Sequence, residues 1–186
     1  MVEKSKPVRR IVAGNDENGK AVVLSDGPSP DVRTDPARPG FSSTRMWVTD
    51  QTPARTKGIQ ETLDTPHTLE PPPNGSVCRI VTFSPDAWFI KDINANKVRS
   101  YFESMGSPNA STFEPKAPHP YMERTKTLDF CHILEGEVTL VLDTEEVHLK
   151  AGDTVIQRGT NHAWSNRSDK PCTIIFCQHD ATFESP

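Results

Sequence analysis

The sequence has no long apolar run. Its longest ones, such as TLVLD and TIIFC, are far shorter than the roughly 20 residues that a membrane-spanning helix needs. The segment MVEKSKPVRRIV also lacks the apolar centre of a secretory signal. We therefore expect no membrane partner.

Concentrated positive charge is missing as well. The chain of 186 residues carries 21 Lys and Arg against 25 Asp and Glu, a net charge of −4, and the basic residues form no patch. Proteins that bind nucleic acid usually present a basic face. We expect a small-molecule partner and no nucleic acid.

Cysteine is scarce, and its spacing fits neither a zinc ribbon nor a redox pair. The four cysteines all lie in apolar surroundings: Cys78, Cys131, Cys172 and Cys177. Free buried thiols are typical of proteins from reducing compartments. This predicts a cytoplasmic protein.

Signals for long helices are also few, whereas 17 prolines and ten glycines favour turns and extended segments. The one good helix candidate is NANKVRSYFESMG, residues 94–106. Val98, Phe102 and Met105 fall on one face of it, and Gly106 is a natural stop.

Short strands are predicted on both sides of this helix. Before it, apolar runs bounded by Gly, Asn and Pro indicate strands in RRIVAG, KAVVLSDG, TRMWVTD and VCRIVTF, with loops over 25–43 and 51–76. After residue 120 the strands are short and the turns tight: RTKTLDFCHIL, EVTLVLD, EVHLK, DTVIQ, HAWSN and PCTIIFCQH. This pattern indicates a mainly β protein, an antiparallel barrel or sandwich. No repeat suggests a second barrel.

The stretch HPYMERTKTLDF, residues 119–130, holds the first candidate site. If it is a strand, Glu123, Thr125, Thr127 and Asp129 share one face, and Arg124 lies on the other. The shared face is either the wet side of a surface strand or the wall of a pocket.

The stretch AGDTVIQRGTNHAWSN holds the second. Gly152, Gly159, His162 and Asn166 match the second motif of the cupin family, in which Gln157 takes the place of a proline. The chain thus resembles a small single-domain cupin, of the kind found beside pathway enzymes and carrying an N-terminal extension. The resemblance implies a jelly-roll barrel.

The first cupin motif is matched only in part. Asp129 stands at its acidic position, because Gly136 follows at the expected distance. The two positions that are usually His fall near Glu123 and Thr125. The resemblance therefore implies a reduced ligand set, on which two chemistries remain open.

In the first chemistry, one divalent metal (Fe, Mn or Zn) is held by His162, Glu123, Asp129 and His119. In the second there is no metal; Glu123 or Asp129, with a pKa raised by burial, is the general acid, and His162 is the base, or the reverse. The residues predicted to bind substrate in either case are Tyr121, Arg124, Thr125, Thr127 and Trp164.

We expect one structural domain, in which residues 1–106 wrap a cupin core of residues 107–186, and a homodimer. The predicted function is that of a lyase, a decarboxylase or dehydratase, acting on a small organic acid or polyketide-like pathway intermediate. The alternatives are a metal-dependent oxygenase and a binding protein without catalysis, since a fold does not determine a reaction.

Overall fold

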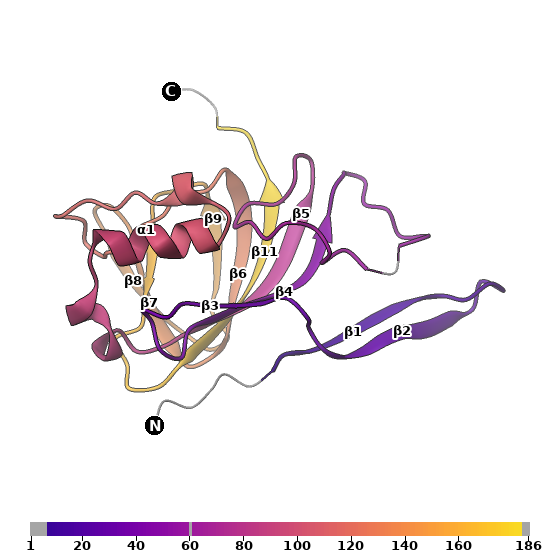
Figure 1. Cartoon of the computed structure of the whole chain (residues 1–186), viewed down its shortest axis with the longest axis horizontal. Helices are drawn as coiled ribbons and strands as arrows, with labels where there is room; N and C mark the ends of the chain where they lie inside the picture. Colours follow the sequence, from indigo (N-terminus) through magenta and orange to yellow (C-terminus); the bar gives the residue numbers. More distant parts are fainter. Residues whose placement is uncertain (1–6, 60, 184–186) are drawn as a thin grey trace.

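The computed structural model describes residues 7–59 and 61–183. Its strands form a two-stranded, a three-stranded and a six-stranded sheet (Figure 1). The strands are β1 (Arg9–Asn15), β2 (Ala21–Pro28), β3 (Val32–Thr34), β4 (Ser42–Thr49), β5 (Ser76–Phe83), β6 (Thr127–Glu135), β7 (Glu137–Val141), β8 (Glu146–Lys150), β9 (Thr154–Arg158), β10 (Ala163–Ser165) and β11 (Cys172–Asp180).

The larger sheet has the order β3-β4-β5-β11-β6-β9, and the smaller one β10-β7-β8. Both enclose one core, to which Val81 of β5, Ile133 of β6, Leu140 of β7 and Ile174 of β11 contribute. Along β6 the residues alternate between buried and more exposed positions, as expected for a strand with one face on the core. The mainly β cupin fold predicted from the sequence is confirmed.

The N-terminal strands are part of this sheet. β11 pairs with β6 on one side and with β5 on the other, and β5 in turn pairs with β4. Side chains of the first half of the chain therefore reach the same interior as those of the cupin motifs. The predicted division of the chain at residue 106, between an N-terminal part and the cupin core, stays a prediction.

Helix α1 (Ala95–Ser104) closes the barrel interior on one side. Asn94 caps it by accepting hydrogen bonds from the backbone N–H groups of Asn96 and Lys97, both at 3.1 Å. Val98 and Phe102 are buried as predicted. Gly106 ends the helix region with φ +67°, and a Cβ there would lie 2.0 Å from the carbonyl oxygen of His67, so only glycine fits.

Short 3-10 turns flank this helix: η1 (Asp86–Trp88), η2 (Ile90–Asp92) and η3 (Pro108–Ala110). In the described residues, no helix is long and apolar enough to cross a membrane. All four cysteines are free; Cys131 and Cys172 are buried, and Cys78 and Cys177 are partly so.

The hairpin of β1 and β2 extends away from the barrel (Figure 1). Arg10 anchors its base with a hydrogen bond of 2.9 Å from Nη1 to Oε1 of Glu61. Farther out, the side chains of Ile11 and Val23 are exposed.

Two predicted boundaries were wrong. The strand expected from Arg124 begins only at Thr127, because the backbone at Glu123 pairs instead with Ser111 and His162 in isolated bridges. The loop expected over 25–43 contains the end of β2 and all of β3. β3 pairs with the first three residues of β4, Ser42 to Thr44.

Candidate active site

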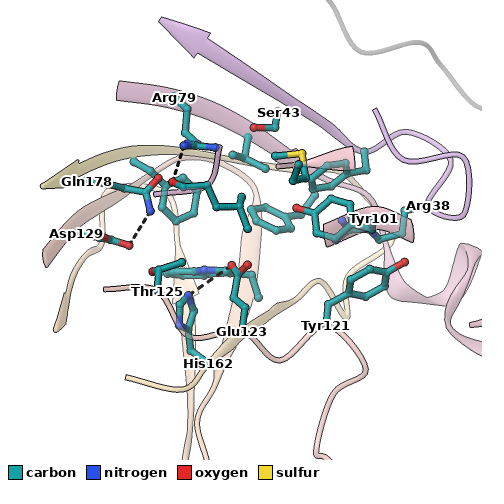
Figure 2. A pocket seen from close by; sticks show the side chains of 17 residues that line it. Arg38, Ser43, Arg79, Tyr101, Tyr121, Glu123, Thr125, Asp129, His162 and Gln178 are labelled. Atoms are coloured by element: carbon teal, nitrogen blue, oxygen red, sulfur yellow. Dashed lines mark hydrogen bonds and ion pairs between the residues drawn. The ribbon is translucent and has the colours of Figure 1, made fainter. Parts of the chain in front are cut away.

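A small cavity lies in the barrel interior, with a volume of about 50 Å³. Aromatic side chains form much of its wall, among them Phe41, Phe83, Tyr101, Trp164 and Phe176. Its polar lining consists of Arg38, Ser43, Arg79, Glu123, Thr125, Asp129, His162 and Gln178 (Figure 2). An apolar cavity with a few convergent polar groups is the usual form of a binding site.

The backbone brings Glu123 and His162 together. The N–H of Glu123 donates to the carbonyl oxygen of His162 at 2.7 Å, and the N–H of His162 donates back to that of Glu123 at 2.9 Å. This reciprocal pair places the two side chains next to each other, with Nε2 of His162 3.8 Å from Oε1 of Glu123.

The other nitrogen of His162 determines its tautomer. Nδ1 lies 3.0 Å from the carbonyl oxygen of Thr160, an acceptor, so Nδ1 carries the hydrogen when the ring is neutral. Burial lowers the pKa of His162 and favours this neutral form. Nε2 is then a free acceptor facing Glu123.

Glu123 is the group best suited to carry a proton. Burial raises its pKa from 4.5 to about 7, although the charges of Arg38 and Arg79 act in the opposite direction. Its side chain is still 22% exposed, whereas that of His162 is 4% exposed. A carboxyl group that titrates near neutral pH and remains accessible can both accept and donate a proton.

Asp129 is more enclosed. Its Oδ2 accepts a hydrogen bond from Nε2 of Gln178 at 3.1 Å, and its Oδ1 has no partner in the described residues. Burial raises its pKa, while the Thr127 hydroxyl and the nearby His162 act against that rise. Asp129 is therefore a second buried carboxyl group in the same cavity.

Arg38 and Arg79 were not predicted from the sequence. Arg79 lies on β5 between the inward-facing Val77 and Val81, so a charged residue in phase with a buried apolar face was the signal. Arg38 lies in the Pro-rich segment before β4, where no pattern marks it.

The predicted substrate-binding residues divide into two groups. Tyr121, Thr125 and Trp164 line the cavity. Thr127 does not line the cavity; its hydroxyl is hydrogen-bonded to that of Thr125 at 2.8 Å. Arg124 does not line the cavity as predicted: its side chain is exposed, and its Nε donates to the carbonyl oxygen of Gly159 at 3.0 Å.

The predicted metal ligands do not assemble. Within residues 7–59 and 61–183, no three His, Cys, Asp or Glu side chains lie where they could hold a metal ion. His119 lies outside the cavity, with Nε2 3.5 Å from Oδ2 of Asp86. Thr125 occupies a position where cupins usually have a ligand. The set of His162, Glu123, Asp129 and His119 therefore does not fit a metal centre, and we derive no chemistry from one.

The comparison with protein families agrees with this architecture. Residues 109–177 match the Cupin_2 family, described as a cupin domain. The cupin match thus covers residues 109–177, and the chain is also similar to fungal biosynthesis-cluster proteins over the stretches given below. Arg38, Ser43 and Arg79 precede the matched segment, so part of the cavity lies outside the family match.

Among curated proteins, "Phomopsin biosynthesis cluster protein C'" of Diaporthe leptostromiformis is 54% identical over 48 residues, which are 25% of this chain and 25% of that protein. "Cupin-domain-containing oxidoreductase fogC" of Aspergillus ruber is 27% identical over 163 residues, 86% of this chain and 64% of that protein. The chain thus matches only a quarter of the first relative's length and just under two thirds of the second's.

Among solved structures, a putative ethanolamine utilization protein Q from Salmonella typhimurium is similar with a TM-score of 0.46 and 12% identity. The similarity covers 96% of this chain and 100% of that one.

Proposed function

We propose that the protein is an enzyme of secondary-metabolite biosynthesis that transfers a proton to or from a small organic intermediate in the cupin cavity. Glu123 is the proton carrier, and the neutral His162 lies beside it and orients its carboxyl group. The reaction class that follows most directly is that of a lyase, a dehydratase or decarboxylase. The similarity to proteins named for biosynthesis clusters supports a role in secondary-metabolite biosynthesis.

The observation that carries this proposal is the Glu123–His162 pair. Glu123 has a pKa raised to about 7 and faces the free Nε2 of a neutral imidazole. In its ionised form the carboxylate accepts a proton from a substrate carbon next to a carbonyl group, and the electron pair moves onto the carbonyl oxygen. The protonated carboxyl group then returns the proton to the leaving group or to the carbon.

The experiment is proton exchange in D₂O, followed by NMR, with a panel of 2-oxo and 3-oxo acids that starts with pyruvate and acetoacetate. Wild-type protein is expected to exchange C–H protons of at least one acid faster than the blank, and Glu123→Gln is expected to lose this exchange. Arg124→Gln is the matched control, because Arg124 lies outside the cavity. Binding of these acids without any exchange would contradict the proposal.

A second candidate is an oxidoreductase. It is favoured by the similarity to two proteins described as cupin-domain-containing oxidoreductases, fogC and virC of Hypocrea virens, the latter 29% identical over 125 residues. Mass spectrometry of the product separates the two candidates. Loss of water or carbon dioxide supports a lyase, whereas gain of oxygen or loss of two hydrogens supports an oxidoreductase.

The homodimer and the cytoplasmic location predicted from the sequence stay predictions.

A further inference from the structure

Buried polar atoms without a partner gather around the cavity. In the described part of the chain, the lining side chains leave these atoms unpaired: Nη2 of Arg38, Oγ of Ser43, Nε and Nη1 of Arg79, Oδ1 of Asp129 and Nε1 of Trp164. Folded proteins rarely leave buried polar atoms unpaired. Their concentration around one cavity indicates a polar ligand, and most of them are hydrogen-bond donors.

Arg79 is the lining residue whose burial points most directly to an anionic ligand. It is 2% exposed, and its partners in the described residues are two backbone carbonyl oxygens, those of Thr68 at 2.8 Å and Leu69 at 2.7 Å, both bound by Nη2. It takes part in none of the ion pairs found there. A buried cation without an anion is unfavourable, so an anionic group in the cavity would complete the site.

Arg38 supplies a second guanidinium group, but its charge is already balanced. Its Nε donates to Oδ2 of Asp35 at 2.8 Å, and its Cζ lies 3.8 to 4.1 Å from the ring centroids of Phe41, Tyr101 and Tyr121. These contacts hold the group rigidly. Arg38 therefore adds one preorganised donor to the cavity wall beside Tyr101 and Tyr121, and the net positive charge comes from Arg79 (Figure 2).

The charges of the cavity carboxyl groups raise the pKa of Arg79 against the effect of its burial, but neither group pairs with it directly. Within the described residues, neither Glu123 nor Asp129 forms an ion pair with Arg79 or Arg38; Glu123 instead lies 3.8 Å from Nε2 of the neutral His162. Figure 2 shows Arg79 and Ser43 on the side of the cavity opposite Glu123 and His162. A ligand bound to Arg79 would thus extend toward the proton carrier.

We propose that Arg79, with Ser43, forms an anion subsite that binds the carboxylate of a small organic acid and presents its remaining atoms to Glu123. The proposal rests on the proposed function for the role of Glu123, and it names the substrate class. The cavity of about 50 Å³ is far smaller than pockets for drug-sized ligands, so it accommodates a short acid or the acidic end of a larger intermediate. Ser43 and Arg79 both precede the cupin match.

Isothermal titration calorimetry with pyruvate and its neutral analogue pyruvamide tests the subsite. Wild-type protein is expected to bind pyruvate at least about tenfold more tightly than pyruvamide, because a charge-assisted hydrogen bond is stronger than a neutral one. Ser43→Ala removes a hydroxyl that has no partner and so leaves the fold intact; it should weaken pyruvate binding about three- to tenfold. Arg79→Lys, checked for folding by circular dichroism, should weaken it about tenfold or more.

Equal binding of pyruvate and pyruvamide, or no binding of pyruvate, would overturn the subsite and leave water as the partner of Arg79. Arg124→Gln is the surface control and should bind as wild type does. Glu123→Gln keeps the subsite, so it should still bind pyruvate while losing proton exchange. Carboxylate binding without exchange in wild type would refute the proposed function alone, and exchange of a neutral ketone without carboxylate binding would refute the subsite alone.

Discussion

Nε2 of His162 lies 3.8 Å from Oε1 of Glu123, and Nδ1 of the same ring is bound to the carbonyl oxygen of Thr160. The imidazole therefore presents an acceptor to the carboxyl group, and the protonated form of Glu123 is the form that this neighbour favours. A proton on Glu123 can leave for substrate while the ring keeps its tautomer.

Substitution of Glu123 by Gln should lower proton-exchange activity by about 10²- to 10⁴-fold, the usual contribution of a general acid or base. With Glu123 as the base, the wild-type rate should rise with pH around a midpoint near 7, where burial places the pKa of this carboxyl group. Exchange rates measured as a function of pH check both points. A wild-type profile without a midpoint near neutral pH would exclude Glu123 as the titrating group.

The same group makes stability depend on pH. The pKa of Glu123 is raised in the folded state from 4.5 to about 7, so the folded protein holds this proton more tightly than the unfolded chain. Its contribution to stability is complete below pH 4.5 and is lost as the pH rises through about 7. Relative to Glu123→Gln, the wild-type free energy of unfolding should fall by about 3 kcal/mol between roughly pH 4 and pH 8.

Urea denaturation at a series of pH values measures this difference. Comparison with the Gln variant removes the effect of other titrating groups, including His67, whose pKa burial lowers to about 4. Parallel curves for the two proteins would show that Glu123 titrates normally.

Asn166 should be required for stability. Its side chain is fully buried; Nδ2 donates to the carbonyl oxygens of Phe83 at 2.9 Å and Lys170 at 2.8 Å, and Oδ1 accepts from the backbone of Ser168. Asn166→Asp keeps the size of the side chain and removes both donors. It should lower the free energy of unfolding by about 2 to 3 kcal/mol at neutral pH.

Arg167→Gln is the matched control for Asn166→Asp, because it breaks the exposed pair with Glu146 and one long hydrogen bond of 3.2 Å from Nε to Oγ of Ser165 and should cost less than about 1 kcal/mol. Chemical denaturation of both variants tests the contrast. Equal, small losses would mean that Asn166 does not hold the β10–β11 connection to the end of β5.

Purified protein should contain well below one transition-metal ion per chain. The side chains that were predicted to hold a metal do not assemble, since His119 is turned to Asp86 and Thr125 stands at a ligand position. Elemental mass spectrometry of wild type and His162→Ala tests this. Near-stoichiometric iron, manganese or zinc in wild type, lost in the variant, would contradict the prediction and favour the oxidoreductase candidate.

The sequence by itself determined the mainly β fold, the helix before residue 106, and the inward face that carries Thr125 and Asp129. These features depend on the periodicity of apolar and polar residues, which repeats every second residue along a strand and about every 3.6 residues along a helix and so can be read from a short segment. The sequence also marked His162 as a candidate site residue, through the second cupin motif. The pairing of Glu123 with His162 needed the backbone bridge between two segments separated by β6 to β9.

Only the tertiary structure decided which distant residues meet. Arg38 and Arg79 reach the cavity because β5 pairs with β11 and the segment before β4 packs against α1. Alternation along β5 marks Arg79 as inward-facing, but no local pattern encodes which strands and segments meet. The same long-range packing buries Glu123 and raises its pKa, and it turns His119 toward Asp86 instead of the cavity. The chemistry of the site therefore depends on desolvation and on neighbours distant in sequence, which form only when the sheet closes.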